Sequence, residues 1–76
     1  MKELLEVLVK NLVSNVDAFE VEQEEDENNI ILKLTVAKED IGKIIGKNGK
    51  IIRNIRTIIK AGAFATEKRV SVEIVE

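Results

Sequence analysis

The stretch that decides the fold runs from residue 41 to residue 55 and reads IGKIIGKNGKIIRNI. Isoleucines recur three and four residues apart on both sides of Gly46-Lys47-Asn48-Gly49, which is the spacing of one apolar helix face. A helix over Lys38–Ile45 is expected to end at Gly46, because glycine adopts the left-handed conformation without a Cβ penalty. A second helix should begin near Gly49. The pattern therefore predicts two helices joined by a GKNG turn.

The second helix is predicted to have two contrasting faces. At about 100° per residue, its isoleucines fall within an arc of about 120°, and its cations fall within another arc of about 120° on the opposite side. The isoleucines are Ile51, Ile52, Ile55, Ile58 and Ile59, and the cations are Lys50, Arg53, Arg56 and Lys60. One face is expected to join the core, while the other is cationic. The sequence Ala61-Gly62-Ala63 predicts the end of this helix.

The flanking segments supply a further helix and three strands. Helical spacing predicts an amphipathic helix over about Lys2–Asn15. A period of two then predicts a hairpin, with strands at Phe19–Val21 and Ile30–Val36 joined by the acidic connection Glu24–Asn29, and a last strand at Val70–Ile74. The order helix, strand, strand, helix, helix, strand predicts one α+β domain over residues 1–76, in which three helices cover one face of a three-stranded sheet.

The composition excludes many kinds of chemistry. The 76-residue chain is 45% hydrophobic and 34% charged, and it contains no Cys, His, Pro, Trp or Tyr. Disulfides, His/Cys zinc sites, thiol catalysis and Ser-His-Asp hydrolysis are therefore excluded, and we expect neither an enzyme nor a cofactor. No apolar run approaches the roughly 20 residues that span a bilayer, and Met1-Lys2-Glu3 lacks the layout of a secretory signal. We expect a cytoplasmic protein with no membrane partner.

The net charge of −2 conceals an uneven distribution. Residues 1–37 carry three basic against nine acidic side chains, a net charge of −6. Residues 38–69 carry nine basic against three acidic side chains, a net charge of +6, and the last seven residues add −2. The basic block surrounds the GKNG turn, and this asymmetry predicts a local site for a polyanion.

The GKNG turn has the features of a phosphate-binding loop. Because Gly46 and Gly49 have no side chains, an extended phosphate backbone can approach the peptides of the turn closely. The N–H groups of the turn and of the next helix's first turn lie at the positive end of the helix dipole. Lys47 and Lys50 add positive charge, and Asn48 can donate from its amide. The turn is therefore predicted to hold phosphate.

The sequence from Ile44 to Ile55 resembles the core of a KH domain, in which a GXXG loop clamps about four backbone nucleotides. The predicted element order is that of the type II KH fold. Four further stretches make the whole chain similar to the bacterial single-domain KH proteins of the KhpA family: the Met-Lys-Glu-Leu opening, Glu39-Asp40-Ile41-Gly42-Lys43 before the loop, Ile55-Arg56-Thr57 after it, and Lys68-Arg69-Val70 before the last strand. The chain departs from the family where Lys38 stands in place of a frequent proline. Gly62 and Phe64 also interrupt a region that is usually richer in alanine.

The resemblance implies a protein that binds single-stranded RNA in the bacterial cytoplasm, as an RNA chaperone or post-transcriptional regulator. It also implies a KH partner resembling KhpB, or a second copy of the chain. We predict that RNA contacts the loop, the groove-side helix before it and two cations after it, namely Gly42, Lys43, Ile45, Gly46, Lys47, Asn48, Gly49, Lys50 and Arg53.

Other interpretations remain open at this stage. The chain could be a protein-interaction subunit that docks a larger RNA-binding partner. A helix-turn-helix for double-stranded DNA is disfavoured, because paired glycines suit backbone approach more than groove insertion. Four cations either extend the RNA track or are ordinary solvated and strand-edge charges: Arg56, Lys60, Lys68 and Arg69.

Three further site types fit the sequence poorly. The acidic connection Glu24–Asn29 lacks the spacing and the glycine of a calcium loop, so we expect a solvated turn and no metal. Ile44 occupies the position at which a P-loop ending at Gly49 would need glycine. Phe19 and Phe64 are the only aromatic residues, too few for a stacking platform of the RRM or OB type.

Overall fold

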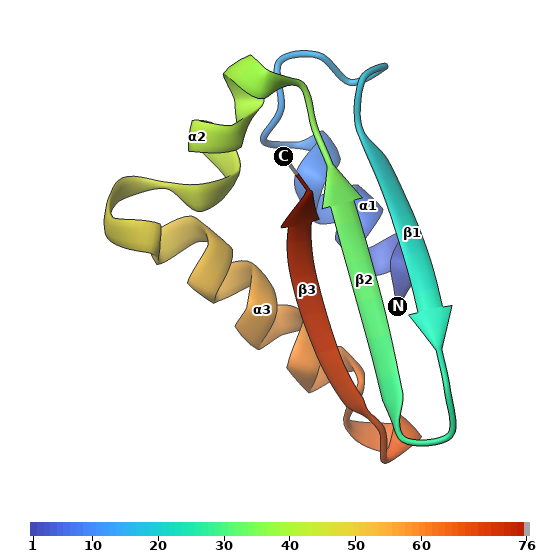
Figure 1. The fold of residues 1–76 in the computed structure, drawn as a ribbon. Helices are drawn as coiled ribbons and strands as arrows, with labels where there is room; N and C mark the ends of the chain where they lie inside the picture. Colours follow the sequence, from blue (N-terminus) through green and yellow to red (C-terminus); the bar gives the residue numbers. More distant parts are fainter. Residues whose placement is uncertain (76) are drawn as a thin grey trace.

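The computed structural model describes residues 1–75, and its elements follow the predicted order (Figure 1). The helices and strands are α1 (Lys2–Lys10), β1 (Glu20–Glu25), β2 (Asn29–Thr35), α2 (Ile41–Ile45), α3 (Lys50–Gly62) and β3 (Arg69–Val75). Short 3-10 turns are η1 (Lys38–Asp40), η2 (Lys47–Gly49) and η3 (Phe64–Thr66). The predicted α+β class, with three helices and a three-stranded sheet, is confirmed.

The sheet combines one antiparallel and one parallel pair. Its order is β1-β2-β3, with β1 antiparallel to β2 and β2 parallel to β3. Leu32 is the register partner of Val72 in the parallel pair. A parallel pair needs a crossover connection, which α2, the GKNG turn and α3 provide here. The GKNG turn therefore lies midway along the crossover, beyond the edge of the sheet (Figure 1).

The core lies between one face of the sheet and the helices. On β2, alternate residues are buried while those between them are partly open, as a sheet covered on one face requires. The largest fully buried apolar side chains are Leu5, Val9, Leu32, Leu34, Ile44 and Ile59. The predicted core face of α3 is confirmed at Ile52, Ile55 and Ile59. Ile58 is 44% exposed, because it lies at the margin of that arc.

The α1 helix is shorter than predicted. The expectation of a helix over Lys2–Asn15 is wrong in its last part, because α1 ends at Lys10. The N–H groups of Ser14 and Asn15 donate to the two carboxylate oxygens of Asp40, at 3.0 and 3.1 Å. These N–H groups therefore bond outside the helix. A side chain distant in sequence sets the path of the chain after α1.

The hairpin is longer and its turn tighter than predicted. β1 and β2 extend into the acidic connection and leave only residues 26–28 between them. The Oδ1 atom of Asp26 accepts hydrogen bonds from the N–H groups of Asn28 and Asn29, both at 2.8 Å. These bonds, with that from Asn28 the stronger, lower the pKa of the Asp26 carboxyl. The turn is closed by its own side chain.

Candidate nucleic-acid interface

Gly46 ends α2, and both its backbone conformation and the space around it require glycine. Its backbone has φ 76° and ψ 176°, a region that essentially only glycine adopts. A Cβ atom built on Gly46 would lie 2.5 Å from Cγ1 of Ile51. The N–H group of Gly46 donates to the carbonyl of Gly42 at 2.9 Å and so closes α2. The loop backbone therefore lies directly against the first turn of α3.

The next residues turn the chain into α3 through two left-handed conformations. Asn48 has φ 57° and ψ 25°, and Gly49 has φ 75° and ψ 16°. Asparagine tolerates this region better than most side chains, and glycine adopts it freely. The N–H group of Gly49 donates to the carbonyl of Gly46 at 3.2 Å. The KNG sequence is therefore suited to a tight turn with two consecutive left-handed residues.

The start of α3 has no side-chain cap. Gly49 occupies the cap position and offers no oxygen, and the first turn of the helix contains no acidic residue. The Lys50 N–H group donates to the carbonyl of Lys47 inside the turn. The first N–H groups of any helix lack partners within it and carry partial positive charge. An anion can therefore take the place that a capping side chain takes in other helices.

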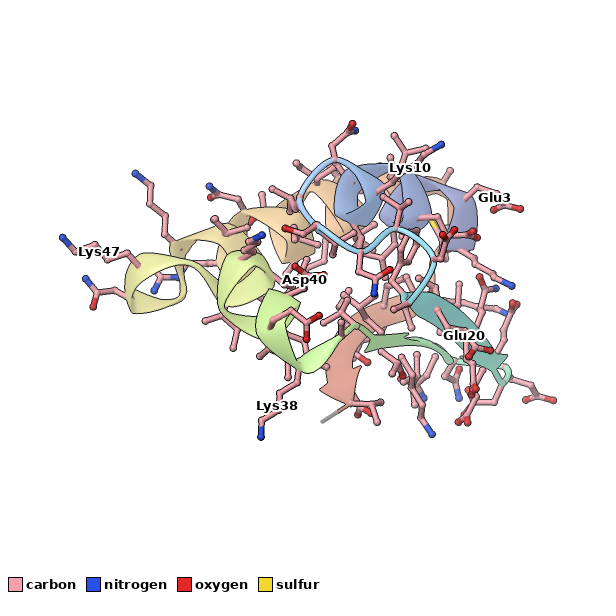
Figure 2. All side chains as sticks on the ribbon, turned by 90° about the horizontal axis from the view of Figure 1, so that it is seen from above. Glu3, Lys10, Glu20, Lys38, Asp40 and Lys47 are labelled. Atoms are coloured by element: carbon pink, nitrogen blue, oxygen red, sulfur yellow. The ribbon has the colours of Figure 1, made fainter. Side chains whose placement is uncertain are left out.

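The exposed cations of the loop are available to such an anion. Lys47, Asn48 and Lys50 are all exposed. Within residues 1–75, neither of these lysines has an acidic group within salt-bridge distance. Figure 2 shows Lys47 projecting from one end of the molecule, with Glu3 and Glu20 at the other end. The GKNG turn thus lies at the opposite end of the molecule from Glu3 and Glu20, whereas the basic block ends beside the acidic hairpin, where Lys68 pairs with Glu25.

Two other predicted site cations are engaged within the protein. Nη2 of Arg53 donates to the carbonyl of Asn48 at 3.3 Å, so Arg53 braces the loop. Nζ of Lys43 hydrogen-bonds to Oγ of Ser14 and lies 3.5 Å from Oδ1 of Asp40. Lys43 therefore lies on the side of α2 that faces the segment after α1, and it would have to exchange partners to meet RNA.

The remaining predicted residues lie on α2. A Cβ atom built on Gly42 would meet no atom within 4 Å, so the surface beside it is open. Ile45 is half-buried and packs against the core. Both flank the GKNG turn on its N-terminal side. Their predicted role in a nucleotide groove stays a prediction.

Asp40 is an anchor that sequence analysis missed. Its side chain is fully buried, and its carboxylate accepts the bonds from Ser14 and Asn15 described above. The bond from the Ser14 N–H group does most to lower the pKa of this carboxyl, with Lys43 contributing. Asp40 occupies the N-cap position of α2 but makes no cap bond to that helix. Its backbone partners lie 25 and 26 residues earlier in the chain, so no local pattern identifies them.

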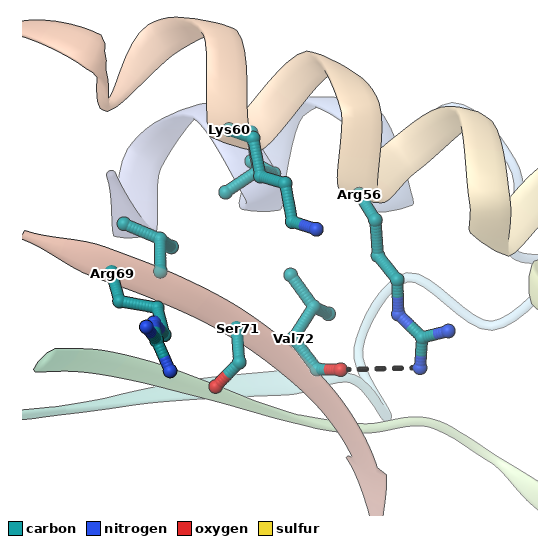
Figure 3. A pocket seen from close by; sticks show the side chains of 7 residues that line it. Arg56, Lys60, Arg69, Ser71 and Val72 are labelled. Atoms are coloured by element: carbon teal, nitrogen blue, oxygen red, sulfur yellow. Dashed lines mark hydrogen bonds between the residues drawn. The ribbon is translucent and has the colours of Figure 1, made fainter.

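A groove runs between α3 and the edge strand β3 (Figure 3). It has a volume of about 440 Å³ and is lined by Arg56, Ile59, Lys60, Arg69, Val70, Ser71 and Val72. Nη2 of Arg56 donates to the carbonyl of Val72 at 3.3 Å, and Lys60 points from α3 toward the strand. The open edge of β3 offers further backbone donors and acceptors. The cationic face of α3 thus forms one wall of a groove.

The four cations left open by the sequence differ in their surroundings. Arg56 and Lys60 line the groove, as does Arg69. Lys68 forms an ion pair with Glu25, the last residue of β1, so much of the charge of Lys68 is neutralised. Lys60 and Arg69 have no such acidic partner within residues 1–75.

Two features are absent from the described residues. None of the helices in residues 1–75 has the length and apolar character needed to cross a membrane. In the same part of the chain, no cluster of three acidic side chains is arranged to hold a metal ion.

Comparison with known families gives one match along almost the whole chain. Residues 2–74 match the family model described as KhpA/KhpB, KH domain. The RNA-binding protein KhpA of Clostridium acetobutylicum is 52% identical over 75 residues, covering 99% of this chain and 100% of the relative. The RNA-binding protein KhpA of Chlamydia trachomatis is 47% identical over 76 residues, covering 100% and 97%.

Solved structures show the same fold within a larger protein. A variant of Aquifex aeolicus Era bound to GDP and AlF4⁻ superimposes with a TM-score of 0.68 at 16% identity. Era in complex with MgGDPNP and nucleotides 1506–1542 of 16S ribosomal RNA superimposes with a TM-score of 0.57 at 19% identity. Each match covers 96% of this chain and 28% of the Era chain. At this identity the likeness shows the fold alone.

Proposed function

Because this chain belongs to the KhpA/KhpB family of KH domains, we propose that it binds RNA and holds a single strand by its phosphate backbone at the GKNG loop. The observation that carries this proposal is the uncapped start of α3, with Gly49 at the cap position and exposed cations on both sides. The family is non-enzymatic, in agreement with the expectation from composition.

In the proposed complex, phosphate oxygens accept hydrogen bonds from the loop and from the first N–H groups of α3. Lys47 and Lys50 neutralise the phosphates, and the Asn48 amide donates a further bond. The bases then extend toward α2, where Gly42 leaves open surface and Ile45 offers an apolar contact. A site of about four nucleotides that holds the backbone gives low sequence specificity. Such binding suits an RNA chaperone or post-transcriptional regulator that acts on many RNAs.

The experiment that tests the proposal reverses the charge of the loop. We expect the double substitution Lys47→Asp with Asn48→Asp to lower affinity for a short single-stranded RNA at least tenfold, since it places carboxylates beside the phosphates. The fold should persist, because both side chains are exposed and aspartate tolerates the left-handed conformation of residue 48. Circular dichroism checks the fold, and fluorescence anisotropy measures the affinity.

The matched control is Lys2→Asp with Asn11→Asp. It changes the net charge equally, at exposed positions at the start of α1 and just after its end, away from the loop and from Arg69. We expect it to bind RNA nearly as well as the unmodified protein. If the loop variant binds as tightly as this control, the loop is not the RNA site.

A protein-docking role is the second candidate, and a second surface favours it. Val7 and Val16 are 58% and 47% exposed, and they line one shallow pocket with Phe19 on the side of α1 away from the core. A KhpB-like KH protein or a second copy of this chain is the proposed occupant. If the isolated chain binds no RNA but forms a complex with such a protein, docking is the primary function.

A further inference from the structure

Phe64 is the most exposed large apolar side chain described, with 88% of its surface open. It lies in η3, between the end of α3 and the start of β3. The other aromatic residue, Phe19, packs against the core. A single exposed apolar side chain is common on protein surfaces, so the surroundings of Phe64 decide whether the ring meets a ligand.

The surroundings of Phe64 continue the groove described above. A second groove of about 300 Å³ is lined by Lys60, Ala63, Phe64, Lys68, Arg69 and Val70. It shares Lys60, Arg69 and Val70 with the groove between α3 and β3. The two are therefore one surface, and Phe64 lies at its far end from Val72.

The charges on this surface match a polyanion. Lys60 and Arg69 have no acidic partner within residues 1–75, while Lys68 is paired with Glu25. An exposed ring beside unpaired cations is the combination that binds single-stranded nucleic acid, because bases stack on the ring and phosphates meet the cations.

We propose that Phe64 is a stacking site for a nucleobase of the same RNA strand that the GKNG loop holds, with Lys60 and Arg69 on the neighbouring phosphates. The inference rests on the proposed function, since it adds a second contact to that strand. One aromatic ring cannot stack several bases, as the RRM surface does. One ring is enough to stack a single base, and the proposal requires only one.

The distance between the two contacts sets the length of RNA required. At 1.5 Å per residue, the helix from Lys50 places Phe64 about 20 Å from the loop. The roughly four nucleotides clamped at a GXXG loop lie at the loop end of this span, so a base at Phe64 must come from further along the strand. Arg56 and Lys60 lie between the two contacts on the cationic face of α3. The Phe64 contact should therefore exist for longer strands and be absent for short ones.

A second copy of the chain fits this surface less well than a nucleic acid. A two-fold contact centred on Phe64 would bring Lys60 and Arg69 of one copy close to the same residues of the other. These cations would repel each other, because neither has an acidic partner nearby to offset its charge. The charge of the patch therefore favours RNA.

The test compares Phe64→Ala, Phe64→Leu and Phe64→Trp on two RNAs, one of about four and one of about twelve nucleotides. We expect Phe64→Ala and Phe64→Leu to lower affinity for the longer RNA about fivefold or more, and Phe64→Trp to retain it. None should change affinity for the short RNA. A 2-aminopurine placed at successive positions of the longer RNA should be quenched at one position by the unmodified protein and by Phe64→Trp alone.

The outcomes separate this inference from the proposed function. Unchanged affinity of Phe64→Ala for the longer RNA overturns the stacking site, while the loop variant still tests the loop. Light scattering gives the oligomeric state of each protein. If Phe64→Ala loses affinity only because a dimer dissociates, the occupant is a second copy and the inference is wrong.

Discussion

At the hairpin tip, the Asp26 carboxylate accepts hydrogen bonds from two backbone N–H groups of its own turn, whereas at the GKNG loop no side chain caps the N–H groups that begin α3. Both are short turns on the surface, and one is acidic while the other is basic. The acidic turn uses its polar side chain to complete its own backbone. The basic turn uses glycine and directs its polar side chains outward. A turn that is open in this way retains the capacity to bind an anion.

The largest expected effect is on stability and comes from adding a side chain at Gly46 in the basic turn. Gly46→Ala should lower the free energy of unfolding by about 2–4 kcal/mol, because it adds backbone strain and a clash with Ile51. Gly49→Ala should cost less, about 1–2 kcal/mol, since its Cβ atom meets open space. Urea unfolding measures both.

The control for Gly46→Ala is Gly42→Ala. Gly42 lies inside α2, and a Cβ atom there meets nothing within 4 Å, so alanine should raise stability by about 0.5–1 kcal/mol. Equal urea midpoints for Gly46→Ala and the unmodified protein would show that the loop backbone adapts to a side chain.

The next effect concerns the anchor beside the basic turn. Asp40→Asn should lower the melting temperature by several degrees at neutral pH, because an amide offers one oxygen to two N–H groups. The folded-state pKa of Asp40 lies below its ordinary value of 3.8, so its stabilisation is fully present above about pH 4 and is lost as pH falls through the folded-state pKa. The difference between the two proteins should therefore shrink in acid. A difference that stays constant down to about pH 2 would contradict an ionised anchor.

A smaller effect is expected at the acidic turn. Asp26→Ala should lower the melting temperature by only a few degrees, because it removes two backbone hydrogen bonds and one from the Asn29 amide, which water can replace at an exposed site. Its affinity for RNA should stay the same. Together with the loop variant, which should lose affinity and keep stability, this tests whether the two turns have separate roles. If Asp26→Ala also lost RNA binding, the acidic turn and the basic turn would not have separate roles.

The smallest effect concerns salt. Each phosphate contact to a single strand contributes about −0.7 to the slope of log affinity against log salt concentration. Lys50→Gln should therefore reduce the magnitude of the slope by about 0.7, whereas Lys33→Gln, which removes a partner of Glu24 on the sheet, should leave it unchanged. Equal slopes for both variants would exclude Lys50 from the phosphate site.

Local patterns were sufficient to predict the elements around the basic turn. The isoleucine spacing placed α2 and α3, and the glycines placed the turn between them. These features depend on residues within a few positions of one another, where periodicity and backbone preference act directly. The first helix was predicted to begin at Lys38, whereas residues 38–40 form the 3-10 turn η1 and α2 begins at Ile41. The resemblance to a KH domain rested on the same stretch and that to the KhpA family on further stretches along the chain, and the family match confirms both.

Features that depend on distant contacts could not be predicted in the same way. The end of α1 at Lys10 follows from bonds between Ser14 and Asp40, which are 26 residues apart. The engagement of Lys43 by Ser14 has the same origin. The exposure of Phe64 follows from where η3 lies on the folded surface. In each case no local pattern identifies the partner.

The strand pairing has a consequence for the order of folding. The hairpin pairs Glu25 with Ile30, whereas the parallel pair joins Leu32 to Val72 across the whole crossover. Closing a long loop loses more chain entropy than closing a short one, so the hairpin should form early and β3 should dock late. Val21→Ala should then mainly slow refolding, and Val72→Ala should mainly speed unfolding, in stopped-flow chevron measurements. The acidic turn would be completed first, and the groove proposed to bind RNA would be assembled in the last step.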